Sequence, residues 1–246
     1  MKKVLFGITS LGLGGAERVL VDIVNKLDGK YDITIFTIYS NGELEKQLNS
    51  NIKLKSLINK RYEYLNKIEK VIVSIKIMLG RKGIYKKKIN QDYDMEIAFL
   101  EGPITRLFAC KNEQTKKVAW VHNDITKVFG SGIKAIIKKK TDKKIYKRYD
   151  KLIFVSKDNK YKFEQVYKLD NCKEVIYNYI DIDSVIEKSN NKMDIEFEKD
   201  TLNIVTVARL VEQKAIDRLI NVHSKLIQNG LSHKIYVIGD GPERAN

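Results

Sequence analysis

Short apolar runs alternate with longer amphipathic segments along most of the chain. Val4–Ile8 and Ile33–Ile38 are mostly apolar and of strand length, and Ala16–Leu27 between them repeats apolar residues at helical spacing. Runs without regular polar positions are typical of strands that are buried on both faces of a parallel sheet. The pattern therefore predicts an α/β fold built from strand–helix–strand units.

The same pattern continues to residue 178. It predicts strands at Ile52–Leu57, Met95–Leu100, Lys117–Val121, Lys151–Val155 and from Val175 to Tyr177, and helices at Asn41–Leu48, Tyr64–Ile89, from Thr105 to Cys110, at Lys134–Tyr149 and after the capping residue Ser156. We expect one doubly wound domain over residues 1–178. Residues 179–199 are largely polar and are predicted to be a linker.

A second strand–helix–strand pattern occupies residues 200–246. Leu202–Val207 and Lys234–Ile238 are the predicted strands, and the helix begins near Ile216. Arg209 and Lys214 lie on the turn between the first strand and the helix. Two cations beside the free N–H groups of a helix N-terminus suit a diphosphate. The alternative is an ordinary unit of this kind with two exposed cations.

These segments also resemble a known family. The run Val207-Ala-Arg-Leu210, the run Lys214-Ala-Ile-Asp-Arg-Leu-Ile220 and the glycine turn after Ile238 resemble the nucleotide-sugar domain of glycosyltransferase family 4, which has GT-B architecture. The resemblance implies that Arg209 and Lys214 contact the donor diphosphate and that Gly239 and Gly241 belong to the donor-site loop. Ala208 and Ala215 stand where this family usually has glycine.

A glycine loop follows the first predicted strand. As a dinucleotide-binding fingerprint it fails, because Glu17 stands where a third glycine is needed and the second strand lacks an acidic residue at its tip. The run Gly14-Gly15-Ala16-Glu17 instead resembles the family's glycine loop. The resemblance implies that Gly14 and Gly15 face the donor diphosphate across an interdomain cleft. A purely structural turn is the alternative.

Polar residues follow two neighbouring predicted strands, Glu101 after the first and His122-Asn-Asp124 after the second. Ligands of open α/β sheets bind at the carboxyl ends of strands. The run Trp120-Val-His-Asn-Asp124 resembles the segment of the family that reaches the reacting sugar. On that basis His122 and Glu101 are the catalytic candidates, His122 for hydrogen bonding a sugar hydroxyl and Glu101 for orienting an acceptor. A structural histidine is the alternative for His122, and His223 and His233 are interpreted as incidental.

The net charge of +15 comes from the middle of the chain. Residues 51–150 hold 25 Lys and Arg against 10 Asp and Glu, whereas the two flanking regions are balanced. The helix predicted at Tyr64–Ile89 combines flanking lysines with one apolar stripe of Leu65, Ile68, Val71, Ile72, Ile75, Met78 and Leu79. This stripe either lies on an anionic membrane or packs into the domain. Nucleic-acid binding has no supporting motif, since the lysines lack interleaved aromatic residues.

Composition argues against a membrane-spanning segment and against a disulfide framework. No apolar run is long enough to cross a membrane, and two cysteines, Cys110 and Cys172, predict free thiols rather than disulfides. By resemblance, the chain is a metal-independent, retaining hexosyltransferase of cell-surface polysaccharide assembly. It would need no cofactor, would use a nucleotide-diphosphate sugar and a glycan or lipid-linked acceptor, and would be cytoplasmic or peripheral on the inner face of the cell membrane.

The family resemblance continues with segments that this chain does not contain. We therefore expect a complete N-terminal domain, a partial nucleotide-sugar domain, and little or no turnover by these 246 residues alone. Two further hypotheses follow, a non-catalytic remnant and one half of a split enzyme that a second chain completes.

Overall fold

A computed structural model describes residues 1–89, 92–110, 112–127, 132–191 and 197–245. The chain divides into two compact units, Met1–Ile182 and Asp183–Asn246. Helix α6 (Ile182–Ser189) begins at this division, inside the predicted linker. Residues 192–196 of that linker lie outside the described residues. The predicted domain limits stay a prediction.

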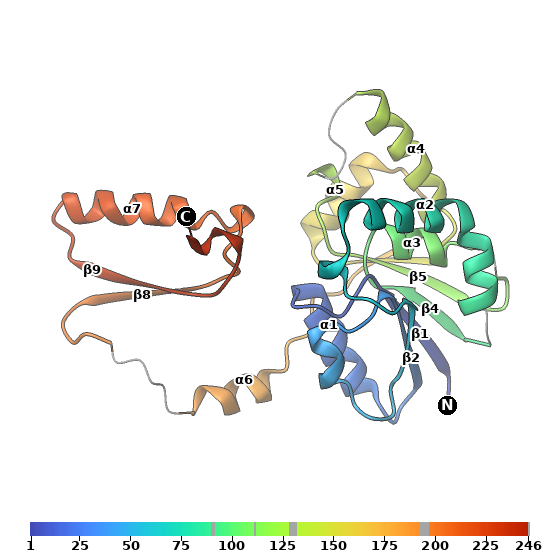
Figure 1. Cartoon of the computed structure of the whole chain (residues 1–246), viewed down its shortest axis with the longest axis horizontal. Helices are drawn as coiled ribbons and strands as arrows, with labels where there is room; N and C mark the ends of the chain where they lie inside the picture. The colour runs from blue at the N-terminus through green and yellow to red at the C-terminus, as the bar shows by residue number, and fades with distance from the viewer. Residues whose placement is uncertain (90–91, 111, 128–131, 192–196, 246) are drawn as a thin grey trace. The chain divides into compact units, whose positions relative to one another are not determined.

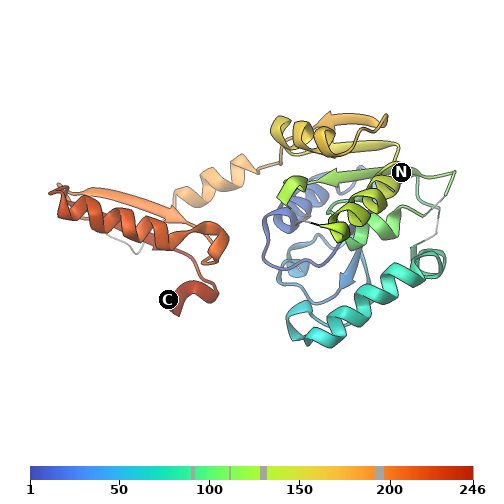
Figure 2. The same ribbon diagram turned by 90° about the horizontal axis from the view of Figure 1, so that it is seen from above.

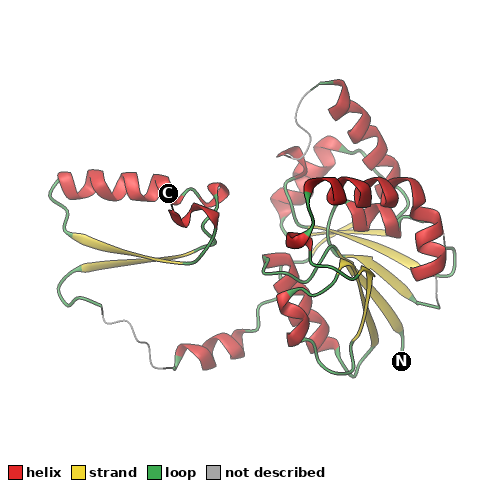
Figure 3. Cartoon of the chain, viewed as in Figure 1, coloured by secondary structure: helices red, strands yellow, loops and turns green. Residues whose placement is uncertain are grey.

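The first unit is built on a seven-stranded sheet in which every neighbouring pair is parallel. The strands occur in the order β3-β2-β1-β4-β5-β6-β7 (Figures 1 and 3). Their bounds are β1 Lys3–Ile8, β2 Asp32–Tyr39, β3 Lys53–Ile58, β4 Met95–Ala98, β5 Lys116–Val121, β6 Lys151–Phe154 and β7 Cys172–Val175. The predicted doubly wound α/β architecture is confirmed. The last strand lies earlier in the chain than predicted. It pairs with β6 from Cys172 to Val175, whereas the sequence pattern predicted a strand from Val175 to Tyr177.

Helices cover both faces of this sheet. Helix α1 (Gly15–Leu27) lies on one face, and α2 (Lys67–Ile84) and α3 (Pro103–Phe108) lie on the other (Figure 1). Helices α4 (Ile133–Tyr146) and α5 (Lys157–Val166) join the second face. Each face of the sheet has its own hydrophobic core, and neighbouring residues of a strand point into different cores. Trp120 belongs to the core under α1, and Val121 belongs to the core on the opposite face of the sheet. This two-sided burial explains why the central strands lack polar alternation.

The strand order creates a switch point between β1 and β4. From β1 the chain continues outward through β2 and β3, whereas β4, β5, β6 and β7 extend in the opposite direction. The connections therefore diverge at the carboxyl ends of β1 and β4. In open α/β sheets such a divergence opens the crevice where ligands bind.

The second unit contains one strand–helix–strand repeat. Strands β8 (Leu202–Val207) and β9 (His233–Ile238) pair in parallel, and α7 (Ile216–Gln228) lies along one face of the pair (Figures 1 and 2). Among residues 197–245, each strand has one edge without a strand partner. Large apolar side chains such as Val207 are exposed. This unit therefore presents open strand edges and a bare sheet face.

Helix α2 departs from the predicted packing. Six of the seven residues in the predicted stripe are exposed, and only Leu65 is buried. The core is filled instead by Val73 and Ile77, on the opposite side of the helix. The alternative in which the stripe packs into the domain is therefore wrong for those six residues. The helix is also shorter than predicted, since residues Tyr85–Ile89 form a π-helical turn.

Two other local predictions, the cap of α5 and the free cysteines, are confirmed. The Ser156 hydroxyl accepts a hydrogen bond from the Asn159 backbone N–H at 3.0 Å and caps α5. Cys110 and Cys172 are free thiols. Within the described part of the chain, no helix is both long and apolar enough to cross a bilayer.

Candidate functional site

The glycine loop lies at the carboxyl end of β1, on the switch point. The backbone of Gly14 begins α1: its N–H donates to the Gly12 carbonyl at 3.0 Å and its carbonyl accepts from Arg18 N–H at 3.0 Å. A Cβ on Gly14 would lie 2.0 Å from a carboxylate oxygen of Glu17, so glycine leaves room for that side chain. A Cβ on Gly15 would meet nothing within 4 Å. Gly15 therefore offers open backbone beside the switch point.

Glu101 and His122 are brought together at the same edge of the sheet. One carboxylate oxygen of Glu101 accepts hydrogen bonds from the backbone N–H groups of His122 and Asn123, both at 2.6 Å. The other accepts from the Asn123 side-chain amide at 3.0 Å. Burial raises the pKa of the Glu101 carboxyl, and these hydrogen bonds oppose the shift. Glu101 thus fixes the segment that carries His122.

The His122 ring is held among aromatic side chains. It stacks on Trp120 with an interplanar angle of 22° and lies 4.8 Å, centroid to centroid, from the Phe99 ring. Burial lowers its pKa to about 4, although a hydrogen bond to the Phe99 backbone opposes the shift. The ring is therefore neutral near pH 7. Its buried Nε2 atom has no hydrogen-bond partner in the described structure, and an unpartnered buried polar atom is costly unless a ligand satisfies it.

The lowered pKa of His122 makes stability depend on pH. Between about pH 6.5 and pH 4 the unfolded histidine binds a proton that the folded one does not, so the free energy of unfolding should fall as pH falls. By pH 5 the loss is at most about 2 kcal/mol. Urea unfolding of the wild type and His122→Gln at pH 7 and pH 5 measures it. Equal losses in the two proteins would show that this ring does not titrate abnormally.

Asn159, Thr126 and Lys162 lie around this pair and were not singled out from the sequence, whereas Asn123 and Asp124 were named only as part of the run after the strand. The Asn159 amide donates to the Asn123 carbonyl at 3.1 Å. Asp124 accepts from Thr126 and lies 3.0 Å from the Lys162 ammonium, and these two interactions lower the pKa of its carboxyl to about 2. The sequence offered one signal for these contacts, namely that Asn123 and Asp124 directly follow His122. Together they anchor the segment after β5 onto α5.

In the second unit the two predicted phosphate-binding cations lie on the turn between β8 and α7. Arg209 and Lys214 are exposed, and neither side chain has a hydrogen-bond or ion-pair partner among the residues that the structure describes. Helix α7 begins after Ala215, which provides no side-chain cap. Ala215 adopts φ 51°, a left-handed conformation that favours the glycine of the family pattern. The turn thus presents two exposed cations beside a helix N-terminus that has no side-chain cap.

Gly239 and Gly241 lie directly against the same turn. The N–H of Ala208 donates to the Ile238 carbonyl at 3.0 Å, and that of Leu210 donates to the Asp240 carbonyl at 2.8 Å. A Cβ on Gly239 would stand 1.8 Å from the Ala208 carbonyl oxygen, and one on Gly241 would stand 2.2 Å from that of Leu210. These two glycines therefore permit the close approach that braces the Arg209 turn.

His223 and His233 are in contact, although no sequence pattern connects them. His223 Nδ1 lies 2.9 Å from His233 Nε2, and His233 Nδ1 lies 3.0 Å from the Leu231 carbonyl oxygen. His233 is buried. The pair fastens α7 to β9. The segment between the two histidines includes the helix end and the turn, so spacing alone could not reveal the contact.

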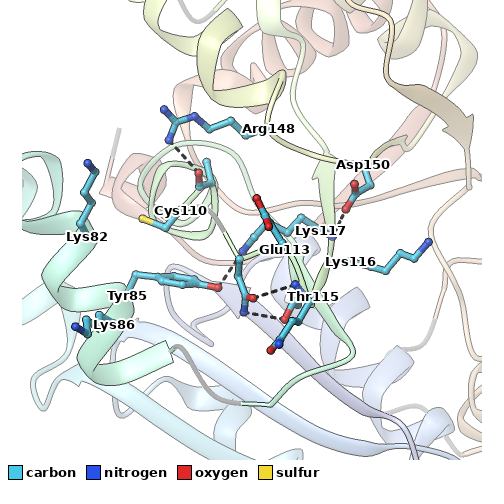
Figure 4. A pocket seen from close by; sticks show the side chains of 13 residues that line it. Lys82, Tyr85, Lys86, Cys110, Glu113, Thr115, Lys116, Lys117, Arg148 and Asp150 are labelled. Carbon is cyan, nitrogen blue, oxygen red and sulfur yellow. Dashed lines mark hydrogen bonds between the residues drawn. The ribbon is translucent and has the colours of Figure 1, made fainter.

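A cavity of about 1060 Å³ lies at the opposite edge of the first sheet, where β5 and β6 begin (Figure 4). Beside it, the Lys117 ammonium lies 2.7 Å from a carboxylate oxygen of Glu96 and 3.0 Å from the Tyr85 hydroxyl. Lys117 and Glu96 are buried, so this pair belongs to the interior of the domain. The cavity is at the amino ends of the strands, away from Glu101, His122 and the glycine loop.

Comparisons with known proteins agree with this architecture. No family model matches the chain. An uncharacterized glycosyltransferase of Methanocaldococcus jannaschii is 27% identical over 142 residues, which cover 56% of this chain and 35% of that protein. The matched segment thus spans about a third of that relative.

Solved structures match almost the whole chain. Anabaena HepE in complex with UDP and glucose matches with a TM-score of 0.58 and 15% identity, covering 98% of this chain and 70% of that one. S. aureus TarM with fondaparinux, α-GlcNAc-glycerol and UDP matches with a TM-score of 0.65 and 12% identity. This match covers 100% of this chain and 73% of the TarM chain. An E. coli trehalose-6-phosphate protein bound with UDP-2-fluoro-glucose matches with a TM-score of 0.67 and 12% identity. This match covers 100% of this chain and 66% of the E. coli chain. The chain has the α/β fold of GT-B glycosyltransferases, with one complete Rossmann-like sheet.

Proposed function

We propose that this chain is a glycosyltransferase that moves a sugar from a nucleotide-diphosphate donor to an acceptor. The observation that carries the proposal is the turn after β8, where Arg209 and Lys214 have no partner among the described residues and α7 has no side-chain cap. Such a turn can stabilise the negative charge that develops on a leaving diphosphate. The M. jannaschii relative and the GT-B fold support the same class of reaction.

The first unit would act on the acceptor. The neutral His122 ring has an unpartnered Nε2 atom, which is buried here and would accept a hydrogen bond from a sugar hydroxyl once the segment after β5 moves to expose it. Both oxygens of Glu101 are engaged by His122 and Asn123, so Glu101 acts as a positioning residue that orients this segment. Gly15 would bring open backbone to the donor diphosphate, and Gly14 would leave room for the Glu17 side chain at the start of α1.

The finer features of the proposal come from the family resemblance. They are membership of glycosyltransferase family 4, retention of anomeric configuration, independence from metal ions and cofactors, and a glycan or lipid-linked acceptor in cell-surface polysaccharide assembly. The chain would work on the cytoplasmic side of the cell membrane and associate with that surface. HepE and TarM were crystallised with UDP, so UDP-sugars are the first donors to test.

The second unit would be completed by further strands. The outer edges of β8 and β9 are unpaired among residues 197–245, and apolar side chains on this sheet are exposed. Additional strands from the same polypeptide or from a second chain would cover them. A non-catalytic remnant remains the alternative, and it would bind an acceptor or a membrane without consuming a donor.

Donor turnover separates these possibilities. The full-length natural protein is incubated with a panel of nucleotide-diphosphate sugars and glycan acceptors, and released nucleoside diphosphate is measured. We expect acceptor-dependent consumption of one donor. Binding of an acceptor without consumption of any donor would support the non-catalytic alternative and contradict the proposal.

A further inference from the structure

Helix α2 exposes a continuous apolar face. Val73 and Ile77 point into the core, but the opposite side carries six large apolar residues that are between 46% and 76% exposed. They recur three and four positions apart and therefore form one stripe along the helix: Ile68, Val71, Ile72, Ile75, Met78 and Leu79. A helix with two opposite apolar faces needs apolar surroundings on both sides, and the first unit provides them on one side.

Helix α4 extends this stripe. Ile137 is 59% exposed. A groove of about 290 Å³ has Met78 of α2 on one side and Ile137 and Ile145 of α4 on the other, so the two helices share one apolar surface. We call the six α2 residues together with Ile137 the α2–α4 face.

Cations are numerous on the two helices of the α2–α4 face. Arg81, Arg106 and Lys138 line the groove itself. The two helices contribute further exposed lysines: Lys67, Lys76, Lys82, Lys139, Lys140, Lys143 and Lys144. The acidic residues of these helices are already paired, since Glu69 lies 2.8 Å from Lys60 and Asp142 lies 2.8 Å from Arg106. The apolar face therefore belongs to two helices that carry a large excess of positive charge.

We propose that the α2–α4 face inserts into the interfacial layer of an anionic lipid bilayer. A bilayer offers acyl chains to the isoleucines and lipid phosphates to the cations of the two helices in a single surface. A second copy of this chain fits less well, because a symmetric contact would place the same lysines opposite one another. The proposal deepens the membrane association in the proposed function. It requires no sugar transfer.

Vesicle binding tests the proposal with two matched variants. Ile72→Gln/Leu79→Gln removes two exposed side chains of the face, whereas Tyr161→Gln/Tyr177→Gln removes two similarly exposed side chains elsewhere. We expect the full chain to sediment with anionic vesicles and much less with neutral ones. The first variant should bind at least about tenfold more weakly. The Tyr161 and Tyr177 variant should bind like the wild type.

A fluorescent probe distinguishes insertion from simple charge attraction. Trp120 is buried, so the Ile75→Trp variant carries one exposed indole, whose emission should shift to the blue with anionic vesicles and be quenched by brominated lipid chains. About 0.5 M salt should weaken binding.

Three results would overturn the proposal. They are equal sedimentation with neutral and anionic vesicles, an unshifted emission from the vesicle-bound Ile75→Trp variant, and a dimer of the wild type that only the Ile72 and Leu79 changes dissociate. Donor consumption with a soluble acceptor should be unchanged in the Ile72→Gln/Leu79→Gln variant, so membrane insertion and sugar transfer can fail separately.

Discussion

Replacing Arg209 with alanine in the full-length protein is expected to lower sugar transfer at least about a hundredfold, the scale for losing one preorganised group that stabilises charge. Lys214→Ala should have a similar effect. Both cations are exposed and have no partner in the described structure, so neither change removes an internal contact. Steady-state rates at saturating donor, together with thermal unfolding, measure transfer and stability separately.

Lys225→Ala is the matched control for these two variants. Lys225 is an exposed lysine in the last turn of the same helix, whose first turn follows Lys214. It should transfer sugar at the wild-type rate. If Arg209→Ala and Lys214→Ala both kept near wild-type turnover, this turn would not be the diphosphate site.

Glu101→Ala is the second change with a large expected effect. It leaves the backbone N–H groups of His122 and Asn123 and the Asn123 amide without their acceptor. The segment should shift, and a displacement of about 1 Å can cost about a hundredfold in rate. We expect the loss in kcat, with little change in the KM for the donor.

Glu101→Gln separates position from charge. An amide oxygen can still accept from the two backbone N–H groups, so positioning should survive and the loss should stay below about tenfold. A loss as large as that of Glu101→Ala would mean that the negative charge itself takes part. Wild-type turnover by Glu101→Ala would remove this residue from the site.

The sheet could be predicted because its central strands are buried on both faces. Such strands are short, apolar and separated by amphipathic helices, and each feature is local in the sequence. The packing of α2 could not be predicted in the same way. This helix is apolar on two opposite sides, and periodicity does not tell which side meets the core. The side with Val73 and Ile77 does so, although the other side holds more apolar residues.

The position of the candidate site in the fold could be predicted from the sequence. The contacts between its residues could not. The ends of β4 and β5 placed Glu101 and His122 at one edge of the sheet. The hydrogen bonds between them depend on the pairing of two strands and on the backbone of residues 122 and 123, which no local pattern encodes. The contact of His223 with His233 was missed for the same reason.

Proton NMR of the transfer reaction tests the central claim most directly. The full-length protein and an Arg209→Ala/Lys214→Ala variant are each followed with a UDP-sugar and a glycan acceptor, while the anomeric signals of donor and product are recorded. We predict that the wild type consumes the donor and forms a product with the donor's anomeric configuration, and that the variant does neither at a comparable rate. Donor consumption that is equal in the two proteins, or no product from the wild type with any nucleotide sugar, would contradict the account.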